Sequence, residues 1–332
     1  MSEASDIPHP REVYDLIGHA EAEAAFEDVR ARGRLHHAWL LTGPEGVGKA
    51  TFAYRAARRL LGAPAMGPGL GSDPEHPVAR QVAARSHPDL LLLDREGSDG
   101  KIRKSIPVEQ ARALGEFFSK SPASAPHRVA IIDAADDLND SSANAILKTL
   151  EEPPPRGVLL MVCHAPGRLL PTIRSRCRRL AFPALDIEAA AAFVRGRTGV
   201  DGETAMLLAE MAGGAPGRAW SLAAGQALEV DAAARELIAA LPAVDPVRAL
   251  ALAETFRGGE GAERFALLFS RLAARVHERT CAGAAAGEGR LDPWAAAWES
   301  LQRIPREAES VNLDRADAFF TALQELRQAA RA

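Results

Sequence analysis

Cysteine is scarce in this sequence, and its few cysteines are poorly placed for a disulfide or a metal. The 332 residues contain three, Cys163, Cys177 and Cys281, widely spaced and forming no CxxC pair. This pattern predicts neither a disulfide framework nor a zinc site. The nine histidines show no HExxH motif and no Cys/His ligand spacing. We therefore predict no structural or catalytic metal.

Long apolar runs are also missing. The longest are short stretches such as residues 158–163 (VLLMVC), whereas a membrane helix needs about 20 apolar residues. The first residues, MSEASDIPHP, are acidic and lack the apolar core of a secretion signal. These absences predict a soluble cytoplasmic protein without membrane contact.

An excess of positive charge is absent as well. Lysine and arginine number 40 against 44 acidic residues, so the formal net charge is -4 at pH 7. Proteins that bind DNA by themselves, whatever its sequence, usually have a basic surface. Any contact with nucleic acid would therefore be local or shared with partner proteins.

The chain does have the length of two or three domains and the composition of a globular protein, with 47% hydrophobic and 25% charged residues. Over residues 1–183, compact apolar runs alternate with helical patterns, which predicts an α/β fold with a parallel sheet. Residues 184–228 and 229–332 are rich in alanine and leucine. They predict a small helical domain followed by a larger helical bundle.

A glycine-rich loop follows the first predicted strand. Residues 43–51 (GPEGVGKAT) are close to G-x-x-x-x-G-K-[ST], the loop that binds phosphates with backbone N–H groups at a helix N-terminus. Ala50 lacks the hydroxyl that would hold Mg²⁺, and Thr51 lies about 100° further round the helix. The candidate nucleotide-binding residues here are Gly43, Gly46, Gly48, Lys49 and Thr51. The loop indicates that the chain descends from a nucleotide-binding protein. Weak binding of ATP or ADP stays open, and the missing hydroxyl disfavours metal-assisted chemistry.

A second element of a phosphate site is an aspartate at the end of a buried strand. Asp133 ends the run VAIID and takes the position of the carboxylate on the magnesium side. In ATPases that hydrolyse their nucleotide, a glutamate usually follows and positions the attacking water. Here Ala134 follows, so the sequence predicts the loss of the general base.

The arginines of residues 172–177 (TIRSRC) have two interpretations. They can simply cover a surface helix, which is the usual role of an isolated arginine. At the edge of a nucleotide-binding domain, however, a guanidinium can reach a phosphate bound by a neighbouring subunit. Spacing alone does not say which arginine would do so.

Four segments of the first 180 residues resemble the bacterial AAA+ clamp-loader family of DNA polymerase III. They are residues 34–51 (RLHHAWLLTGPEGVGKAT), 86–94 (SHPDLLLLD), 143–154 (ANAILKTLEEPP) and 169–180 (LLPTIRSRCRRL). The LKTLEEPP helix end and the SRC triplet at this separation are specific to that family. The resemblance implies an AAA+ P-loop domain over residues 1–183, a helical lid over 184–228 and a helical oligomerisation collar over 229–332.

Within the family, the chain resembles the stator subunit rather than the motor subunits. Motors carry Ser or Thr after the loop lysine, Glu after the strand aspartate, and an arginine in the lid. Here these positions are Ala50, Ala134 and Gly217, with Arg218 one residue out of register. The resemblance implies a subunit of a DNA-directed DNA polymerase (nucleotidyltransferase) holoenzyme that has no ATPase activity of its own and lends Arg176 in trans to a neighbouring ATPase.

The resemblance also implies partners: the gamma/tau motor subunits and the delta subunit in a hetero-pentamer, and through that complex the sliding clamp and primer-template DNA. Many members carry a four-cysteine zinc module after the phosphate-loop helix. Residues 62–89 contain no cysteine, so no zinc and no required cofactor are implied.

Two other functions stay open at this point. The chain can be an active AAA+ motor that uses Thr51 and a displaced acid, or a P-loop protein of another kind, such as a small-molecule kinase or a helicase loader. The sequence does not decide whether the loop binds nucleotide in the complex, or how residues 62–77 fold. It also leaves open which collar helices contact which neighbour, and whether Arg178 and Arg179 approach DNA.

Overall fold

The structure, a computed structural model, describes residues 7–96, 101–153, 155–287, 290–310 and 313–331. Residues 1–6 of the acidic start and Pro154 of the LKTLEEPP segment lie outside this range. The chain divides into two compact units after Ser221. The first unit includes helices that the sequence assigned to a separate lid, so the predicted boundaries at 183 and 228 stay predictions.

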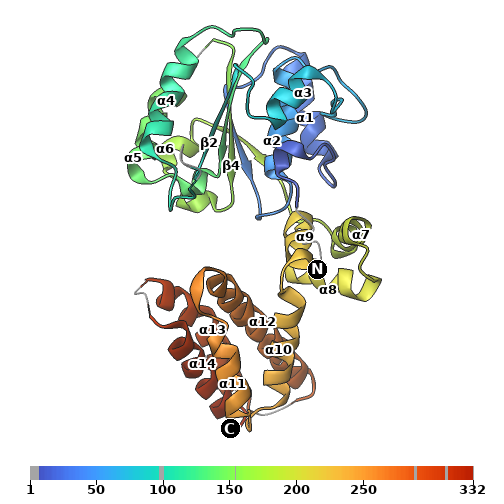
Figure 1. The fold of residues 1–332 in the computed structure, drawn as a ribbon, viewed down its shortest axis with the longest axis vertical. Coiled ribbons are helices and arrows are strands. Elements are labelled where there is room, and N and C mark those ends of the chain that lie inside the picture. The colour runs from blue at the N-terminus through green and yellow to red at the C-terminus, as the bar shows by residue number, and fades with distance from the viewer. Residues whose placement is uncertain (1–6, 97–100, 154, 288–289, 311–312, 332) are drawn as a thin grey trace. The chain divides into compact units, whose positions relative to one another are not determined.

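A parallel sheet of five strands forms the centre of the first unit (Figure 1). Its strands are β1 (Ala38–Thr42), β2 (Leu90–Asp94), β3 (Arg128–Asp133), β4 (Gly157–Cys163) and β5 (Arg178–Ala181). They lie in the order β2-β3-β4-β1-β5, and every neighbouring pair is parallel. The central strands are continuous apolar runs because helices cover both faces of the sheet. The α/β class predicted from the sequence is confirmed.

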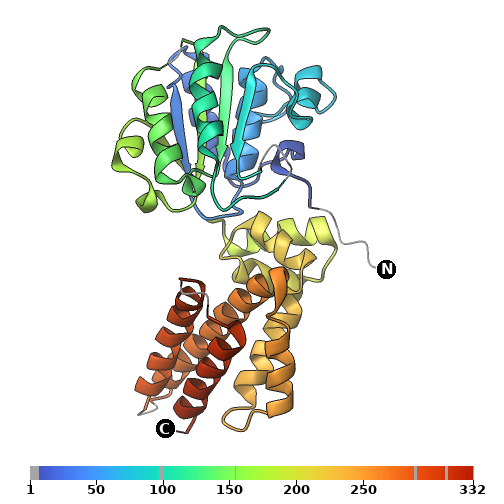
Figure 2. The same ribbon diagram turned by 60° about the vertical axis from the view of Figure 1, so that its left-hand side comes forward.

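Helices pack on the two faces of the sheet, as Figures 1 and 2 show. One face is covered by α1 (Ala20–Ala31), α2 (Lys49–Leu60) and α3 (Pro77–Ala83), and the other by α4 (Val108–Ser119), α5 (Asp140–Glu151) and α6 (Pro171–Arg174). Side chains of a strand alternate between faces. Trp39 and Leu41 of β1 therefore join one core, with Phe26 and Phe52, and Leu40 joins the other.

Three further helices complete the first unit: α7 (Ile187–Thr198), α8 (Gly202–Met211) and α9 (Pro216–Ala224), of which α9 ends just past the division. Helices α7 and α8 pack through small side chains, Ala190, Ala191, Ala205 and Ala209. Three short 3-10 helices lie at Pro10–Glu12, Ala135–Asp137 and Pro166–Arg168. We call α7–α9 the lid helices.

The glycine and proline content of residues 62–77 predicts an irregular surface segment. Residues 62–76 contain no helix or strand, but they are not wholly on the surface. Leu70 is fully buried. Its N–H group donates to the carboxylate of Glu23 at 3.3 Å, and Arg55 donates to the Pro68 carbonyl at 3.3 Å. Glu23 and Arg55 form a buried ion pair at 2.7 Å. The expectation was wrong for the middle of the segment, because this pair draws its backbone into the core.

The second unit is entirely helical over its described residues. It consists of α10 (Ala227–Ala239), α11 (Pro246–Glu254), α12 (Gly258–Ala285), α13 (Asp292–Ser310) and α14 (Arg315–Ala329), which lie side by side in orange to red in Figure 2. Four phenylalanines occupy its core: Phe256, Phe265, Phe269 and Phe319. The ring centroids of Phe256 and Phe319 are 5.5 Å apart, so this aromatic contact joins the connection between α11 and α12 to α14.

A buried carboxylate ties α10 to α12 in this unit. Asp231 is fully buried and accepts hydrogen bonds from Arg271 at 2.7 Å, Arg275 at 3.0 Å and Arg235 at 3.0 Å. Burial alone would raise the pKa of Asp231, but these guanidinium groups hold it below its ordinary value. Because the charge is compensated where it is buried, the cluster stabilises the helical unit.

We predict that Asp231→Ala lowers the free energy of unfolding by about 3 kcal/mol, since it leaves Arg271 buried without its carboxylate. Urea unfolding of the full chain, followed by circular dichroism, measures the change. The control is Glu254→Gln, which removes an exposed ion pair to Arg257 at 2.6 Å and should cost less than about 1 kcal/mol. Equal effects of the two substitutions would contradict this assignment.

Candidate functional site

The glycine-rich loop joins β1 to α2, as predicted. Helix α2 begins at Lys49, and Gly48 before it has a φ angle of 111°. Gly46 has a φ angle of 75°, and a Cβ atom there would lie 2.4 Å from the backbone nitrogen of Arg218. Glycine adopts such positive φ angles at little cost. The loop therefore needs glycine for its backbone conformation and also for the close approach of the lid.

Lys49 is folded into the loop that precedes it. Its side chain is buried, and Nζ donates to the carbonyl groups of Gly43 at 2.6 Å and Pro44 at 2.5 Å. Burial lowers the pKa of Lys49 to about 8, and the charges of Asp136 and Asp133 partly oppose this. An anion beside Lys49 would stabilise its charged form. The loop thus has the backbone geometry and the cation of a phosphate site.

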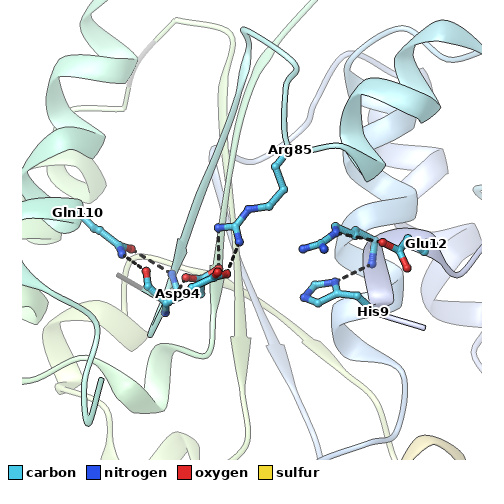
Figure 3. A network of polar contacts seen from close by, with 7 residues as sticks. His9, Glu12, Arg85, Asp94 and Gln110 are labelled. Carbon is cyan, nitrogen blue, oxygen red and sulfur yellow. Dashed lines mark hydrogen bonds and ion pairs between the residues drawn. The ribbon is translucent and has the colours of Figure 1, made fainter. Parts of the chain in front are cut away.

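Asp133 ends β3, at the same edge of the sheet as the loop. Burial raises the pKa of Asp133 to about 6, although the Lys49 charge lowers it. Asp94, its partner on β2, is held by Arg85 at 2.9 Å (Figure 3). On the side opposite Arg85, the Gln110 side-chain oxygen accepts a hydrogen bond from the backbone N–H group of Asp94 at 3.1 Å. Arg85 compensates part of the charge of Asp94, and the remaining charge helps to raise the pKa of Asp133.

The two acidic residues after Ala134 already have other partners. Asp136 accepts hydrogen bonds from the backbone N–H groups of His164 at 2.6 Å and Ala165 at 2.7 Å, which fixes the turn after β4. Asp137 forms an ion pair with Arg95 at 3.3 Å. Both carboxylates therefore have partners within the fold.

A cavity of about 550 Å³ opens in front of the loop. Three parts of the first unit line it: the phosphate loop with Asp133 and His164, the lid helices, and the N-terminal segment (residues 7–17). Most of its apolar lining comes from the last two parts, including Ile7, Pro8, Val13, Leu16, Ile17, Phe193 and Trp220, and Val47, Ala50 and Val162 add to it beside the loop. The volume suits a small-molecule site. A cavity with one apolar end and one end formed by a phosphate loop fits a nucleoside phosphate.

None of these apolar residues was predicted as a site residue, and neither was His164. His164 directly follows β4, the neighbour of β1, so its position after a buried strand was a usable signal. The N-terminal segment and Trp220 carry no such local signal. The predicted Gly46, Gly48, Lys49, Thr51 and Asp133 all line the cavity, whereas Gly43 contributes its carbonyl to Lys49.

The lid helices contact the loop directly. The N–H group of Gly217, at the start of α9, donates to the Gly46 carbonyl at 2.8 Å. Gly217 is the position where the resemblance places the lid arginine of motors. Arg218, one residue further, is exposed and also lines the cavity. A lid cation is therefore present in the wall, displaced by one residue from the expected position.

Arg176 lies between α6 and β5. It donates to the Thr172 carbonyl at 3.0 Å and forms an ion pair with Glu151 at 2.8 Å, with about a third of its side chain exposed. It is not among the described residues that line the cavity. The nearby Arg179 donates to the Thr42 hydroxyl at 2.9 Å, and Arg178 stacks over Trp39. A DNA contact of this pair stays an open question.

Within the described ranges, no three His, Cys, Asp or Glu side chains are grouped so that they could hold a metal ion. No described helix is both long and apolar enough to cross a bilayer.

A profile of the family described as DNA polymerase III, delta subunit, matches residues 18–186, about half of the chain. The chain belongs to this family. The matched residues of this chain include the phosphate loop, Asp133 and Arg176, and they end before the lid helices. The resemblance to clamp-loader subunits noted in the sequence is thus confirmed.

Individual relatives agree with the family. The chain is 38% identical over 162 residues to the DNA polymerase III subunit delta' of Pseudomonas aeruginosa, covering 48% of this chain and 47% of that one. It is 38% identical over 145 residues to subunit delta' of Yersinia pestis (44% and 41%). It is 35% identical over 169 residues to subunit gamma of Buchnera aphidicola (51% and 44%). The matched segment spans less than half the length of these relatives.

Among solved structures, the chain is similar to a DNA polymerase III gamma subunit-related protein of Thermotoga maritima. The identity is 18%, the TM-score is 0.44, and the match covers 92% of this chain and 99% of that one.

We predict that Asp133→Asn stabilises the folded protein at pH 7.5. The pKa of Asp133 is about 6 in the fold against 3.8 ordinarily, so ionising this carboxyl group costs folding free energy above pH 6. The variant should gain about 1–3 kcal/mol at pH 7.5, and the gain should shrink as the pH falls toward 4.

Urea unfolding at several pH values measures this difference. The control Asp28→Asn removes an exposed carboxylate paired with Arg32 at 2.8 Å and should show no such gain. A loss of stability in Asp133→Asn at pH 7.5 would show that the Lys49 charge outweighs burial at this carboxylate.

Proposed function

We propose that this chain is the delta-prime, or stator, subunit of a DNA polymerase III clamp loader. It does not hydrolyse ATP itself, and it supplies Arg176 to the ATP site of a neighbouring motor subunit. The observation that carries the proposal is a phosphate cradle without the groups for hydrolysis: the loop and Lys49 are in place, while Ala50 and Ala134 lack the magnesium hydroxyl and the water-positioning carboxylate. The cavity keeps weak ATP or ADP binding.

The surroundings of Ala134 support the absence of turnover. Positioning the attacking water is one of the main contributions of an ATPase site to phosphoryl transfer. The only acids directly downstream, Asp136 and Asp137, are held by the turn after β4 and by Arg95. The displaced lid cation Arg218 does not weaken this argument, because a lid arginine contacts phosphate and does not activate water.

The setting of Arg176 supports a role in trans. Its partner Glu151 ends α5, so one exposed ion pair joins the LKTLEEPP and SRC segments on which the family resemblance rests. An exposed ion pair contributes little to stability, about 0–1 kcal/mol. Arg176 can therefore exchange Glu151 for a phosphate on another subunit at low cost.

The partners of the proposed complex follow from the family. Its relatives are named delta', gamma and tau subunits of DNA polymerase III. We propose that gamma/tau motors and the delta subunit assemble with this chain in a cytoplasmic hetero-pentamer of the polymerase holoenzyme, which places the sliding clamp on primer-template DNA.

Arg176→Ala tests the function in a complex reconstituted with the motor and delta subunits of the same organism. An arginine finger contributes about 10³–10⁵ to the rate at its own ATP site. We expect clamp loading to fall at least about tenfold, while size-exclusion chromatography still shows the intact complex. The matched control is Arg174→Ala, an exposed arginine at the end of α6, two residues before Arg176. Normal loading by the Arg176→Ala complex would refute the trans role.

The purified chain tests the absence of hydrolysis. We expect no ATP turnover above background, with or without Mg²⁺. Substantial turnover that disappears in both Lys49→Ala and Thr51→Ala would instead establish an active motor that uses the hydroxyl of Thr51.

A further inference from the structure

Arg58, near the end of α2, is a buried cation without a carboxylate partner. Its side chain has no exposed surface. Its guanidinium donates to the backbone carbonyl of Val13 at 3.3 Å and to that of Arg11, and it lies 3.9 Å from the ring centroid of Tyr14. Among the described residues it forms no ion pair. All of these partners belong to the N-terminal segment.

Burying such a charge is costly. A buried ion without a counter-ion costs several kcal/mol, and arginine does not escape the cost by deprotonation. The carboxyl end of α2 and the Tyr14 ring offset part of this cost. An apolar side chain of similar length would fill the same space without it. An apolar side chain could not bind backbone carbonyls. The guanidinium does so, and the carbonyls that it binds have no partner in a strand or helix.

One of the two carbonyls that it holds belongs to a residue of the cavity wall. Val13 lines the cavity together with Pro10, Leu16 and Ile17 of the N-terminal segment, whereas Arg11 lies beside the wall in sequence and does not line it. Arg55, one turn earlier on α2, donates to the Tyr14 carbonyl and forms the buried ion pair with Glu23. Figure 3 shows the start of the segment, with His9 and Glu12 on the far side of Arg85 from Asp94. Two arginines of α2 thus hold the backbone carbonyls of Arg11, Val13 and Tyr14.

The same helix carries Lys49 at its first residue, nine residues before Arg58. At 1.5 Å per residue, the two side chains are about 13 Å apart along the helix, too far for Arg58 to share a phosphate with Lys49. Arg58 consequently acts on the apolar end of the cavity, through the segment that it holds.

We propose that Arg58 is a positioning residue for nucleotide binding: it fixes residues 11–14 so that Val13 and its neighbours form the wall against which the nucleoside packs. This inference rests on the proposed function, because it takes the cavity to bind a nucleoside phosphate. It predicts that Arg58 sets the affinity for the nucleoside part and leaves the affinity for the phosphate part unchanged.

The test compares two probes on the full chain: fluorescently labelled ADP, and inorganic pyrophosphate as its competitor. Arg58→Met removes the fork that binds the carbonyls and keeps the apolar volume. We expect ADP affinity to fall about tenfold, the effect of losing a well-fitted apolar wall, with pyrophosphate affinity unchanged. The matched control is Arg59→Met, the next residue of α2, which contacts Ala63 and Glu27 and no residue of the N-terminal segment.

A second measurement does not depend on nucleotide. Arg11 lies in the held segment, so trypsin should cut after it faster in Arg58→Met than in wild type or Arg59→Met. If Arg58→Met fails to fold, Arg58→Lys keeps the charge and one donor, and should give an intermediate ADP affinity and cleavage rate.

Three results would overturn the inference: an unchanged ADP affinity in the Arg58 variants, an equal loss for ADP and pyrophosphate, or no faster cleavage after Arg11. Absence of ADP binding to wild type would also overturn it, together with the proposal of residual nucleotide binding. The trans role of Arg176 is tested separately by clamp loading and would be unaffected.

Discussion

The close approach of Gly46 to Gly217 is the constraint on which the candidate site depends. A Cβ atom on Gly46 would lie 2.4 Å from the backbone of Arg218, and one on Gly217 would lie 2.8 Å from the Gly46 carbonyl. Because neither residue has a side chain, the first turn of α9 rests directly on the phosphate loop. This contact brings Arg218 and Trp220 into the cavity wall, so that the cavity has a wall of lid residues as well as the sheet edge.

Helix α2 connects the two ends of that cavity. Its first residue, Lys49, belongs to the phosphate loop, and its later turns hold the N-terminal segment through Arg55 and Arg58. A rigid helix fixes the distance between these two ends of the cavity. The shape of the cavity therefore does not depend on a hydroxyl at position 50 or on a carboxylate at position 134.

The parts of the structure that sequence could predict are those with a local cause. Apolar runs predicted the strands, and the loop motif located Gly46 and Lys49, because strand, turn and helix follow one another without a gap. The contact of Gly217 with Gly46 and the burial of Leu70 could not be predicted, since they join residues far apart through backbone groups and leave no periodicity. The role of Arg176 stays a prediction, because its proposed target lies on another subunit.

The carboxylate of Asp231 has a consequence for the helical unit beyond stability. Arg271 and Arg275 stand one turn apart on α12, and both bind the same buried group on α10. Sliding α12 by one turn in one direction would put Leu267 where Arg271 now lies, opposite a carboxylate. Sliding it the other way would pull Arg279 off the face of Trp294, where it now stacks at 4.8 Å. Asp231 and Trp294 together thus select one register of α12 against α10 and α13, helices that alanine and leucine alone would leave free to slip.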